Sequence, residues 1–343
     1  MKLSIIIQKF EKQIPLALQE PWDQCGLQLG DPSAEVKSIL FAYDVCKETI
    51  QAARKSKCQL IVTHHPFRMK GDTAVRLDTY EGKLIEACIK NGSCLYASHT
   101  NHDNSIESTN VRILKELGLS NIRPLQPSLI KLYKLIVFVP QKHREEVLTA
   151  IFNAGAGTMG NYDECSFSVA GTGMFRGNES THPFIGKKGE RTLVEEERIE
   201  VIVKEPDLKH VIARMIEVHP YEEVAYDIYP LENKMTSQGG GAVGSFDRPV
   251  KQDVLIQKMK TIFNIPMLRF VSSPKQSFKT IAICTGSGTH LLNAVIAQKA
   301  DLFITGDVKY HQAVHARRHD LALADVGHFH SEQLSVEILK EIF

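Results

Sequence analysis

The chain has 343 residues, of which 43% are hydrophobic and 24% charged, as in ordinary globular proteins of two or three domains. Its net charge of +1 provides no broad electrostatic field that would favour DNA, RNA or an acidic membrane as a partner. No stretch approaches the ~18 apolar residues of a membrane span. The N-terminal MKLSIIIQKFEKQIP reaches Lys9 and Glu11 too early for a signal peptide and predicts an amphipathic helix. The seven cysteines are scattered and form no C-x-x-C pair, which predicts a reduced, cytoplasmic protein.

The first third of the chain alternates apolar runs with helical patterns, which is typical of an α/β layer architecture. The predicted strands span residues 38–45, 59–63 and 93–98, and the predicted helices span 47–57, 80–90 and 108–117.

The last third repeats this alternation and is expected to belong to the same α/β domain. Its predicted strands span residues 279–284, 301–305 and 321–326, and its predicted helices span 290–299, 310–318 and 332–342.

The middle of the chain has a different order, β-α-β-β-α-β, which is the pattern of a ferredoxin-like domain. Pro124 and Pro127 are expected to mark its front boundary, and the glycine-rich segment 234–241 its back boundary. We therefore predict an inserted α+β domain at residues 128–235 within an α/β domain made from residues 1–127 and 236–343. The predicted elements are strands at 131–139, 165–172, 198–203 and 225–230, helices at 144–154 and 207–217, and a loop at 175–189.

Histidines and carboxylates cluster after three of the predicted strands. His64 and His65 close the strand QLIVTHH, the motif SHTNHD follows the next strand at 98–103, and GHFHSE follows the last strand at 327–332. Ligands of open α/β sheets bind beyond the carboxyl ends of the strands. We therefore expect the three clusters to meet at one sheet edge. A single histidine after a strand is more often structural, so the joint occurrence carries the prediction.

The spacing within these clusters suits metal binding. Adjacent strand residues face opposite ways, so His64 and His65 can share a site only at a strand end or with two ions side by side. His328 and Glu332 are four residues apart and share a face if that turn is helical. A carboxylate such as Asp103 can bridge two cations. Imidazole with carboxylate suits Zn, Mn, Fe or Co better than Ca.

Together, these motifs resemble the family of GTP cyclohydrolase I type 2 homologs, also called NGG-interacting-factor-three-like proteins. Seven elements in family order carry the resemblance: WDQCGLQLG (22–30), YDV (43–45), VTHHPF (62–67), SHTNHD (98–103), TGSG (285–288), FITGDVKYH (303–311) and GHFHSE (327–332). One departure is Gln24–Cys25, where the family more often has Asn followed by a small residue, and it is expected to alter packing near the site.

The resemblance implies a centre of two divalent metal ions whose ligands map onto His64, His65, Asp103, His328 and Glu332. It also implies a toroidal homohexamer whose sites face an internal cavity. The predicted insertion, which includes HPYEEVAYDIYP (219–230), is similar to the CutA- or PII-like insertion of the family's longer members.

Several further residues have two interpretations. His99 and Asp307 are expected either to orient metal-binding imidazoles or to cap turns. His99 and His330 are the candidates for proton transfer. The backbone of Gly286, Ser287 and Gly288 is expected either to hold a phosphate or to form a tight turn. Trp22 is expected to be a packing residue.

The predicted function is that of a metal-dependent hydrolase acting on a nucleotide, with water activated by two metal ions. The resemblance suggests GTP, opened with loss of formate to give dihydroneopterin triphosphate. The alternatives are a non-catalytic, metal-binding regulatory or scaffold protein and a phosphoesterase. No P-loop or basic, aromatic-studded stripe is found, so nucleic acid is an unexpected partner.

Overall fold

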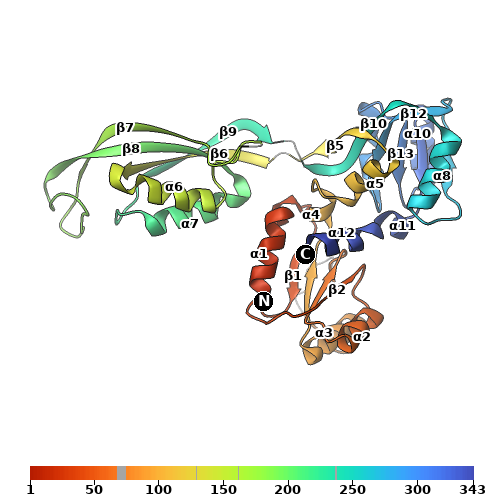
Figure 1. Ribbon diagram of the computed structural model, residues 1–343, viewed down its shortest axis with the longest axis horizontal. Coiled ribbons are helices and arrows are strands. Elements are labelled where there is room, and N and C mark those ends of the chain that lie inside the picture. The colour runs from red at the N-terminus through yellow and green to blue at the C-terminus, as the bar shows by residue number, and fades with distance from the viewer. Residues whose placement is uncertain (68–74, 129, 161, 236–237) are drawn as a thin grey trace. The chain divides into compact units, whose positions relative to one another are not determined.

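The computed structural model describes residues 1–67, 75–128, 130–160, 162–235 and 238–343 (Figure 1). The chain divides into two compact units: unit 1 is Met1–Ser128 with Ser237–Phe343, and unit 2 is Leu129–Thr236. None of the helices in the described residues has both the length and the apolar character needed to cross a membrane.

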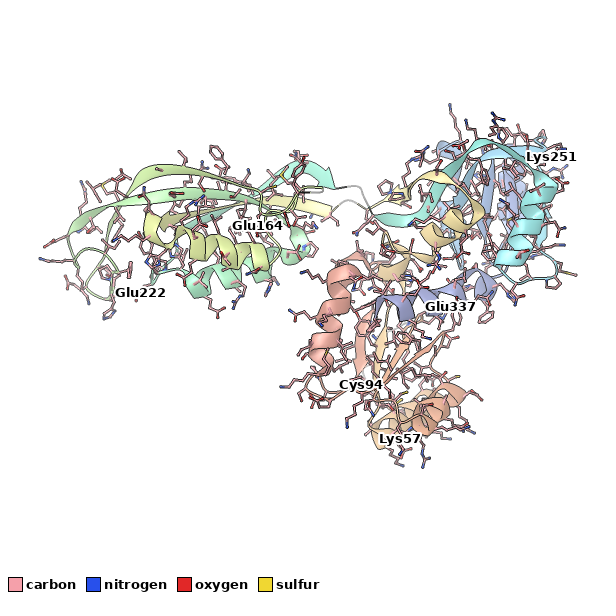
Figure 2. All side chains as sticks on the ribbon, viewed as in Figure 1. Lys57, Cys94, Glu164, Glu222, Lys251 and Glu337 are labelled. Atoms are coloured by element: carbon pink, nitrogen blue, oxygen red, sulfur yellow. The ribbon has the colours of Figure 1, made fainter. Side chains whose placement is uncertain are left out.

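Unit 1 contains a four-stranded sheet of order β1-β4-β3-β2, in which β2, β3 and β4 are parallel and β1 is antiparallel. Phe10 packs with Leu60 and Tyr96 on one face of this sheet, where Cys94 is also buried (Figure 2). Ile61 and Leu95 face the other side, toward α2 and α3. Burial on both faces explains the continuous apolar runs of these strands. The elements are α1 (Leu3–Gln13), β1 (Gly26–Leu29), β2 (Ile39–Ala42), α2 (Lys47–Lys55), β3 (Leu60–Thr63), α3 (Tyr80–Asn91) and β4 (Cys94–Ala97).

A second sheet of unit 1 has six strands in the order β11-β14-β13-β12-β10-β5, with β12, β13 and β14 parallel. Leu114 and Met259 pack against one face from α5 and α8, and Leu292 and Ala316 pack against the other face from α9 and α10. The elements are α4 (Thr100–Asp103), α5 (Thr109–Leu117), β5 (Ser120–Pro127), β10 (Gly239–Lys251), α8 (Gln252–Ile262), β11 (Arg269–Val271), β12 (Ser277–Ile283), α9 (Leu292–Ala297), β13 (Leu302–Thr305), α10 (Tyr310–Arg318), β14 (Ala322–Asp325), α11 (His328–Glu332) and α12 (Leu334–Ile342).

Unit 2 is a four-stranded antiparallel sheet of order β7-β8-β6-β9, with both of its helices against one face. Leu135 and Ile199 of the sheet are fully buried against Val147 of α6 and Val211 of α7. The elements in chain order are β6 (Ile130–Pro140), α6 (Arg144–Asn153), β7 (Ser166–Arg176), β8 (Arg191–Lys204), α7 (Leu208–Val218) and β9 (Tyr226–Met235).

The strands β5 and β10 were not predicted from the sequence. Pro124 and Pro127, expected to mark a boundary, lie inside β5, and Gly239–Gly241 begins β10 rather than ending a linker. Prolines are tolerated there because β5 is an edge strand, which needs only half of its backbone hydrogen bonds. Strand β8 likewise begins seven residues before the predicted 198, through the charged segment RTLVEEE, and β7 extends into the predicted loop 175–189.

The expectation that all three histidine clusters lie at one sheet edge is wrong. Strands β3 and β4, which precede two clusters, belong to the four-stranded sheet, whereas β14, which precedes the third, belongs to the six-stranded sheet. The clusters therefore come from the carboxyl ends of two sheets within unit 1. An alternation of strands and helices cannot reveal how many sheets the strands form.

Candidate metal centre

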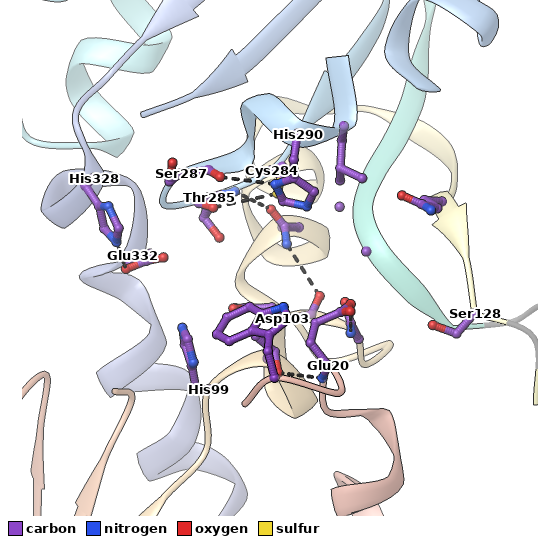
Figure 3. Close-up of a pocket in the computed structure, with 18 of the residues that line it drawn as sticks. Glu20, His99, Asp103, Ser128, Cys284, Thr285, Ser287, His290, His328 and Glu332 are labelled. Atoms are coloured by element: carbon purple, nitrogen blue, oxygen red, sulfur yellow. Dashed lines mark hydrogen bonds and ion pairs between the residues drawn. The ribbon is translucent and has the colours of Figure 1, made fainter. Parts of the chain in front are cut away.

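Five predicted ligands lie together in unit 1, each just beyond a strand end. His64 and His65 follow β3, Asp103 ends the short helix α4 after β4, and His328 and Glu332 begin and end α11 after β14. Figure 3 shows Asp103, His328 and Glu332 around the same cavity. The helical turn that would put His328 and Glu332 on one face is present.

The carboxylate of Glu332 lies among three imidazoles. Its Oε2 is 3.1 Å from Nε2 of His328, 3.5 Å from Nε2 of His65 and 3.8 Å from Nε2 of His64. The hydroxyl of Tyr43 donates a hydrogen bond to the same oxygen. The residue is 3% exposed, so a carboxylate is held in the interior by donors from several segments.

Two polar atoms at this position are buried without a hydrogen-bond partner among the described residues: Nε2 of His64 and Oδ1 of Asp103. The Nε2 atom of His64 lies 4.0 Å from Oδ2 of Asp103. Unpaired buried polar atoms are costly, and imidazole with carboxylate is a donor set for transition metals. The residues therefore fit a metal ion. Three groups have ligand atoms within 4.8 Å of one another: His64 with His65 and His99, His64 with His102 and Asp103, and His65 with His328 and Glu332.

Each of the three imidazoles around Glu332 is oriented through its other nitrogen. Nδ1 of His65 is 2.8 Å from Oδ1 of Asp44, and Nδ1 of His328 is 2.7 Å from Oδ2 of Asp307. Nδ1 of His64 is 3.2 Å from the carbonyl of Ser98. A neutral ring that donates Nδ1–H to these acceptors presents the Nε2 lone pair to the site, which is the arrangement that metal centres use.

The pKa values of the histidines and carboxylates at this centre are shifted by burial and by neighbouring charged groups. Burial alone would raise the pKa of Glu332, but the neighbouring imidazoles of His328, His64 and His65 outweigh it and lower the pKa. Burial, and then the charge of Glu332, raises the pKa of Asp103. The hydrogen bond to Glu332 raises the pKa of His328 to about 9, whereas burial lowers the pKa of His64.

The two candidates for proton transfer lie in different surroundings. His99 lines the cavity, and Nδ1 of its ring is 3.1 Å from Oδ1 of the buried Asp23. His330 is not among the described residues that line the cavity, and its buried Nδ1 has no partner there. His99 thus lies beside the candidate metal centre, and its ring nitrogen could join His64 and His65 in holding an ion.

The cavity beside the centre has a volume of about 610 Å³. Trp22 lines it with 57% of its surface exposed, so this indole is not the packing residue that the sequence suggested. The ring of Trp22 stands edge-on to His99 with centroids 5.9 Å apart. An exposed flat indole at a cavity wall can stack on a planar ring of a ligand.

The TGSG turn forms part of the wall, but its amides are largely occupied. The backbone N–H of Gly286 donates to Oγ of Ser331, and that of Gly288 donates to Oγ1 of Thr305. This favours the tight-turn interpretation over the phosphate cradle. Gly286 has a positive φ of 66°, and a Cβ atom there would lie 2.0 Å from Oε1 of Glu332. A glycine is needed so that the carboxylate can occupy this space.

Sequence reasoning did not assign roles to Asp23, Tyr43, Asp44 and His102. Asp23 lies in WDQCG, whereas Tyr43 and Asp44 lie in the YDV motif directly after β2. The signal available in the sequence was their position after the ends of strands or within these motifs. His102 is fully buried, and burial lowers its pKa to about 3, so its ring is neutral.

Comparison with known proteins identifies the family. The profile of the family described as Duf34/NIF3 (NGG1p interacting factor 3) matches residues 1–343. This chain belongs to the Duf34/NIF3 family. A relative from Halalkalibacterium halodurans, named GTP cyclohydrolase 1 type 2 homolog, is 38% identical over 324 residues, which cover 94% of this chain and 87% of the relative. A Bacillus subtilis relative of the same name is 35% identical over 325 residues, with the same two coverages.

A solved structure of the family is similar over the whole chain. The Bacillus cereus protein related to NIF3 has a TM-score of 0.85 and 35% identity, and the match covers 100% of this chain and 92% of that protein. This Duf34/NIF3 member therefore shares its fold with a protein of known structure, and the resemblance of its motifs to the family is confirmed.

Proposed function

We propose that this Duf34/NIF3 member is a metal-dependent hydrolase of a nucleotide. Its metal centre would hold two divalent ions, of Zn, Fe, Mn or Co, with His64, His65, Asp103, His328 and Glu332 as ligands. The single observation that carries the proposal is the set of three imidazole Nε2 atoms within 3.8 Å of one buried carboxylate oxygen of Glu332.

The polypeptide itself would bind, orient and protect the reacting groups. A divalent ion held by these residues supplies Lewis-acid polarisation and lowers the pKa of water. Asp44 and Asp307 keep the rings of His65 and His328 in one tautomer, so that each Nε2 faces the centre. His99, held by Asp23 at the cavity wall, is the residue we propose for proton transfer at its Nε2.

The cavity supports a nucleotide-sized substrate. A volume of about 610 Å³ is within the usual range for small-molecule sites. Trp22 offers a flat surface for a base, and Asn110, Ser287 and His290 offer polar atoms on other parts of the wall. The relatives named GTP cyclohydrolase 1 type 2 homolog make GTP the first substrate to test. A phosphoester is the second, because two-metal sites also serve phosphoryl transfer.

The proposal also concerns the fold of unit 2 and the oligomeric state. The β-α-β-β-α-β order of unit 2 and its sheet order β7-β8-β6-β9 support the prediction of an inserted ferredoxin-like domain of the CutA/PII kind. We also propose the toroidal homohexamer that the family resemblance implies. The cytoplasmic location stays a prediction.

The test combines metal analysis with product detection on one purified sample. Metal analysis should return about two transition-metal ions per chain. Incubation with GTP should release formate and produce a pteridine absorbance. The variant Asp103→Ala should abolish both products, whereas Asp247→Ala, at an exposed position of β10, should leave them unchanged.

The competing function is a metal-binding scaffold without catalysis. Of the two predicted proton-transfer residues, His99 lines the cavity and His330 is not among its described lining residues, so a single candidate remains for that step of a hydrolase. A fully metal-loaded sample that converts neither GTP nor a panel of nucleotides and phosphoesters would favour the scaffold over the hydrolase.

A further inference from the structure

Unit 2 has a cavity of its own, with a volume of about 420 Å³. It lies on the sheet face opposite α6 and α7, because Glu196 is three residues from Ile199 on β8 and successive strand residues alternate in direction. The wall is completed by the turn between α7 and β9 and by the loop after β7. Its principal side chains are Phe138, Phe175, Phe184, Glu196 and Tyr221.

A buried carboxylate with one unused oxygen forms the floor of this cavity. Glu196 is 8% exposed, and its Oε1 accepts a 2.6 Å hydrogen bond from the hydroxyl of Tyr221. Burial and this hydrogen bond raise the pKa of Tyr221, so the phenol keeps its proton and stays the donor. In the described part of unit 2, no group donates a hydrogen bond to Oε2 of Glu196. This oxygen is therefore available to accept a hydrogen bond from a ligand in the cavity.

The space for this carboxylate depends on a residue without a side chain. A Cβ atom at Gly173 would lie 1.9 Å from Oε2 of Glu196. Gly173 faces the same cavity from β7, next to β8. The sequence AGTGMF therefore places a glycine where any other residue would push the carboxylate out of its position.

The turn that carries Tyr221 is fixed by a buried histidine. The Nε2–H group of His219 donates to the carbonyl of Phe138 at 3.1 Å, and Nδ1 accepts from the backbone N–H of Tyr221 at 3.1 Å. Burial lowers the pKa of His219, which agrees with a neutral ring in this tautomer. The motif HPYEE thus holds Tyr221 over Glu196 before any ligand binds, and both side chains are pre-organised.

The remaining walls combine aromatic rings with negative charge. The ring of Tyr221 lies 6.3 Å from that of Phe175 and 6.4 Å from that of Phe184, measured between centroids. Glu222 and Glu223 lie at the rim with a single cation, Arg176, among the described lining residues. Glu222 (Figure 2) accepts from the backbone N–H of His182 and ties the loop to the turn.

We propose that this cavity binds an organic ammonium ion, whose N–H group donates to Oε2 of Glu196 and whose hydrocarbon body lies against Phe175, Phe184 and Tyr221. Aromatic faces attract ammonium groups, and a buried carboxylate forms strong hydrogen bonds with them. A neutral apolar ligand would leave Glu196 unpaired, and an anion would face three carboxylates. The described residues here also contain no group of three donors placed to hold a metal ion.

The ammonium group could belong to a free amine or to an amino acid, and Arg176 distinguishes the two. A free amine needs only Glu196 and the rings. An amino acid carries a carboxylate that the guanidinium of Arg176 can bind at the rim.

The experiment is a calorimetric titration of the full-length, metal-loaded protein with phenethylamine, phenylalanine and phenylpropionate. We expect saturable binding of an ammonium compound and none of phenylpropionate. Glu196→Gln keeps the size and the Tyr221 partner but should weaken binding by about 10- to 100-fold, as expected for a hydrogen bond between charged groups. Gly173→Ala should weaken it through displacement of the carboxylate.

Glu195→Gln is the matched control, because Glu195 lies next to Glu196 on β8 but faces the other side of the sheet and is exposed. It should bind like the unmodified protein, and all variants should keep the same metal content. If phenylalanine binds more tightly and Arg176→Gln removes that preference, the ligand is an amino acid. If phenethylamine and phenylalanine bind equally well and Arg176→Gln changes neither affinity, the ligand is a free amine. The proposal is overturned if neither ammonium compound binds, or if Glu196→Gln and Gly173→Ala both bind like the Glu195 control.

Discussion

Glu332 of unit 1 and Glu196 of unit 2 are both carboxylates withdrawn from solvent, but their neighbours differ in kind. Three imidazoles and a phenol surround Glu332. Glu196 is surrounded by the phenol of Tyr221, by aromatic rings and by the space that Gly173 leaves because it has no side chain. Nitrogen lone pairs can be shared with a metal ion, whereas ring faces cannot and suit a larger cation of low charge density. The surroundings of a buried charge thus indicate the class of cation that it accepts.

The largest expected effect comes from Glu332. In Glu332→Gln the negative charge among His64, His65 and His328 is lost, and an amide nitrogen replaces an acceptor oxygen. We expect the purified variant to retain almost no transition metal, measured by elemental analysis. Glu337→Gln, on the exposed side of α12 and labelled in Figure 2, is the control and should keep the metal of the unmodified protein. Full metal content in Glu332→Gln would remove this carboxylate from the ligand set.

The clustering of the metal-site residues could be predicted from the sequence, because ligands of open α/β sheets bind beyond the carboxyl ends of the strands. His64, His65, Asp103, His328 and Glu332 all have that signature, and the four-residue spacing of the last two fits a helical turn. Their membership of two sheets could not be predicted, since pairing between strands depends on contacts between distant segments. The exposure of Trp22 was missed for a similar reason: a sequence does not show which apolar residues border a cavity.

Strand β10 is a second feature that could not be predicted from the sequence, for a different reason. Its GGGAVG start reads as a linker because glycine is rare in strand interiors. In the structure, Gly239 approaches the backbone of β5 so closely that a Cβ atom would lie 2.2 Å from the carbonyl oxygen of Gln126. Gly239 is therefore a packing requirement of this strand pair, which becomes visible only when the partner strand is known.

A smaller effect is expected at Asp307, which orients a ligand without reaching the centre. Asp307→Asn removes the charge that accepts from Nδ1 of His328, and we expect metal affinity to fall by about 10- to 100-fold. The pKa of His328 in the metal-free protein, about 9, should fall toward its ordinary value of 6.5. A raised pKa stabilises the folded protein fully below pH 6.5, and this contribution is lost as the pH rises through about 9. The variant should lose part of that stabilisation.

Two measurements check this prediction: metal competition with a chelator, and NMR titration of the imidazole of His328 in the metal-free protein. Asp227→Asn, at an exposed position of unit 2, provides the control. An unchanged affinity together with an unchanged pKa of His328 would mean that Asp307 has no positioning role.

The smallest effect on the metal centre is expected from the largest change, the removal of unit 2. The chain leaves unit 1 at Ser128 and returns at Gln238, and the N–H of Ser128 donates to the carbonyl of Gln238 at 2.8 Å. Pro127 and Gly239 are already paired across β5 and β10. An Asn-Gly dipeptide in place of residues 129–237 would therefore close an ordinary two-residue hairpin. Each unit also has its own core.

We expect this shortened chain to bind the same number of metal ions with the same affinity, measured by elemental analysis and chelator competition, and to bind no ammonium compound. A variant with Glu332→Gln in the shortened chain should again lose the metal and serves as the control. If the shortened chain folds, as judged by circular dichroism, but no longer retains metal, then unit 2 contributes to the centre. The sites at Glu332 and Glu196 would then be coupled, and they would not bind their two classes of cation independently.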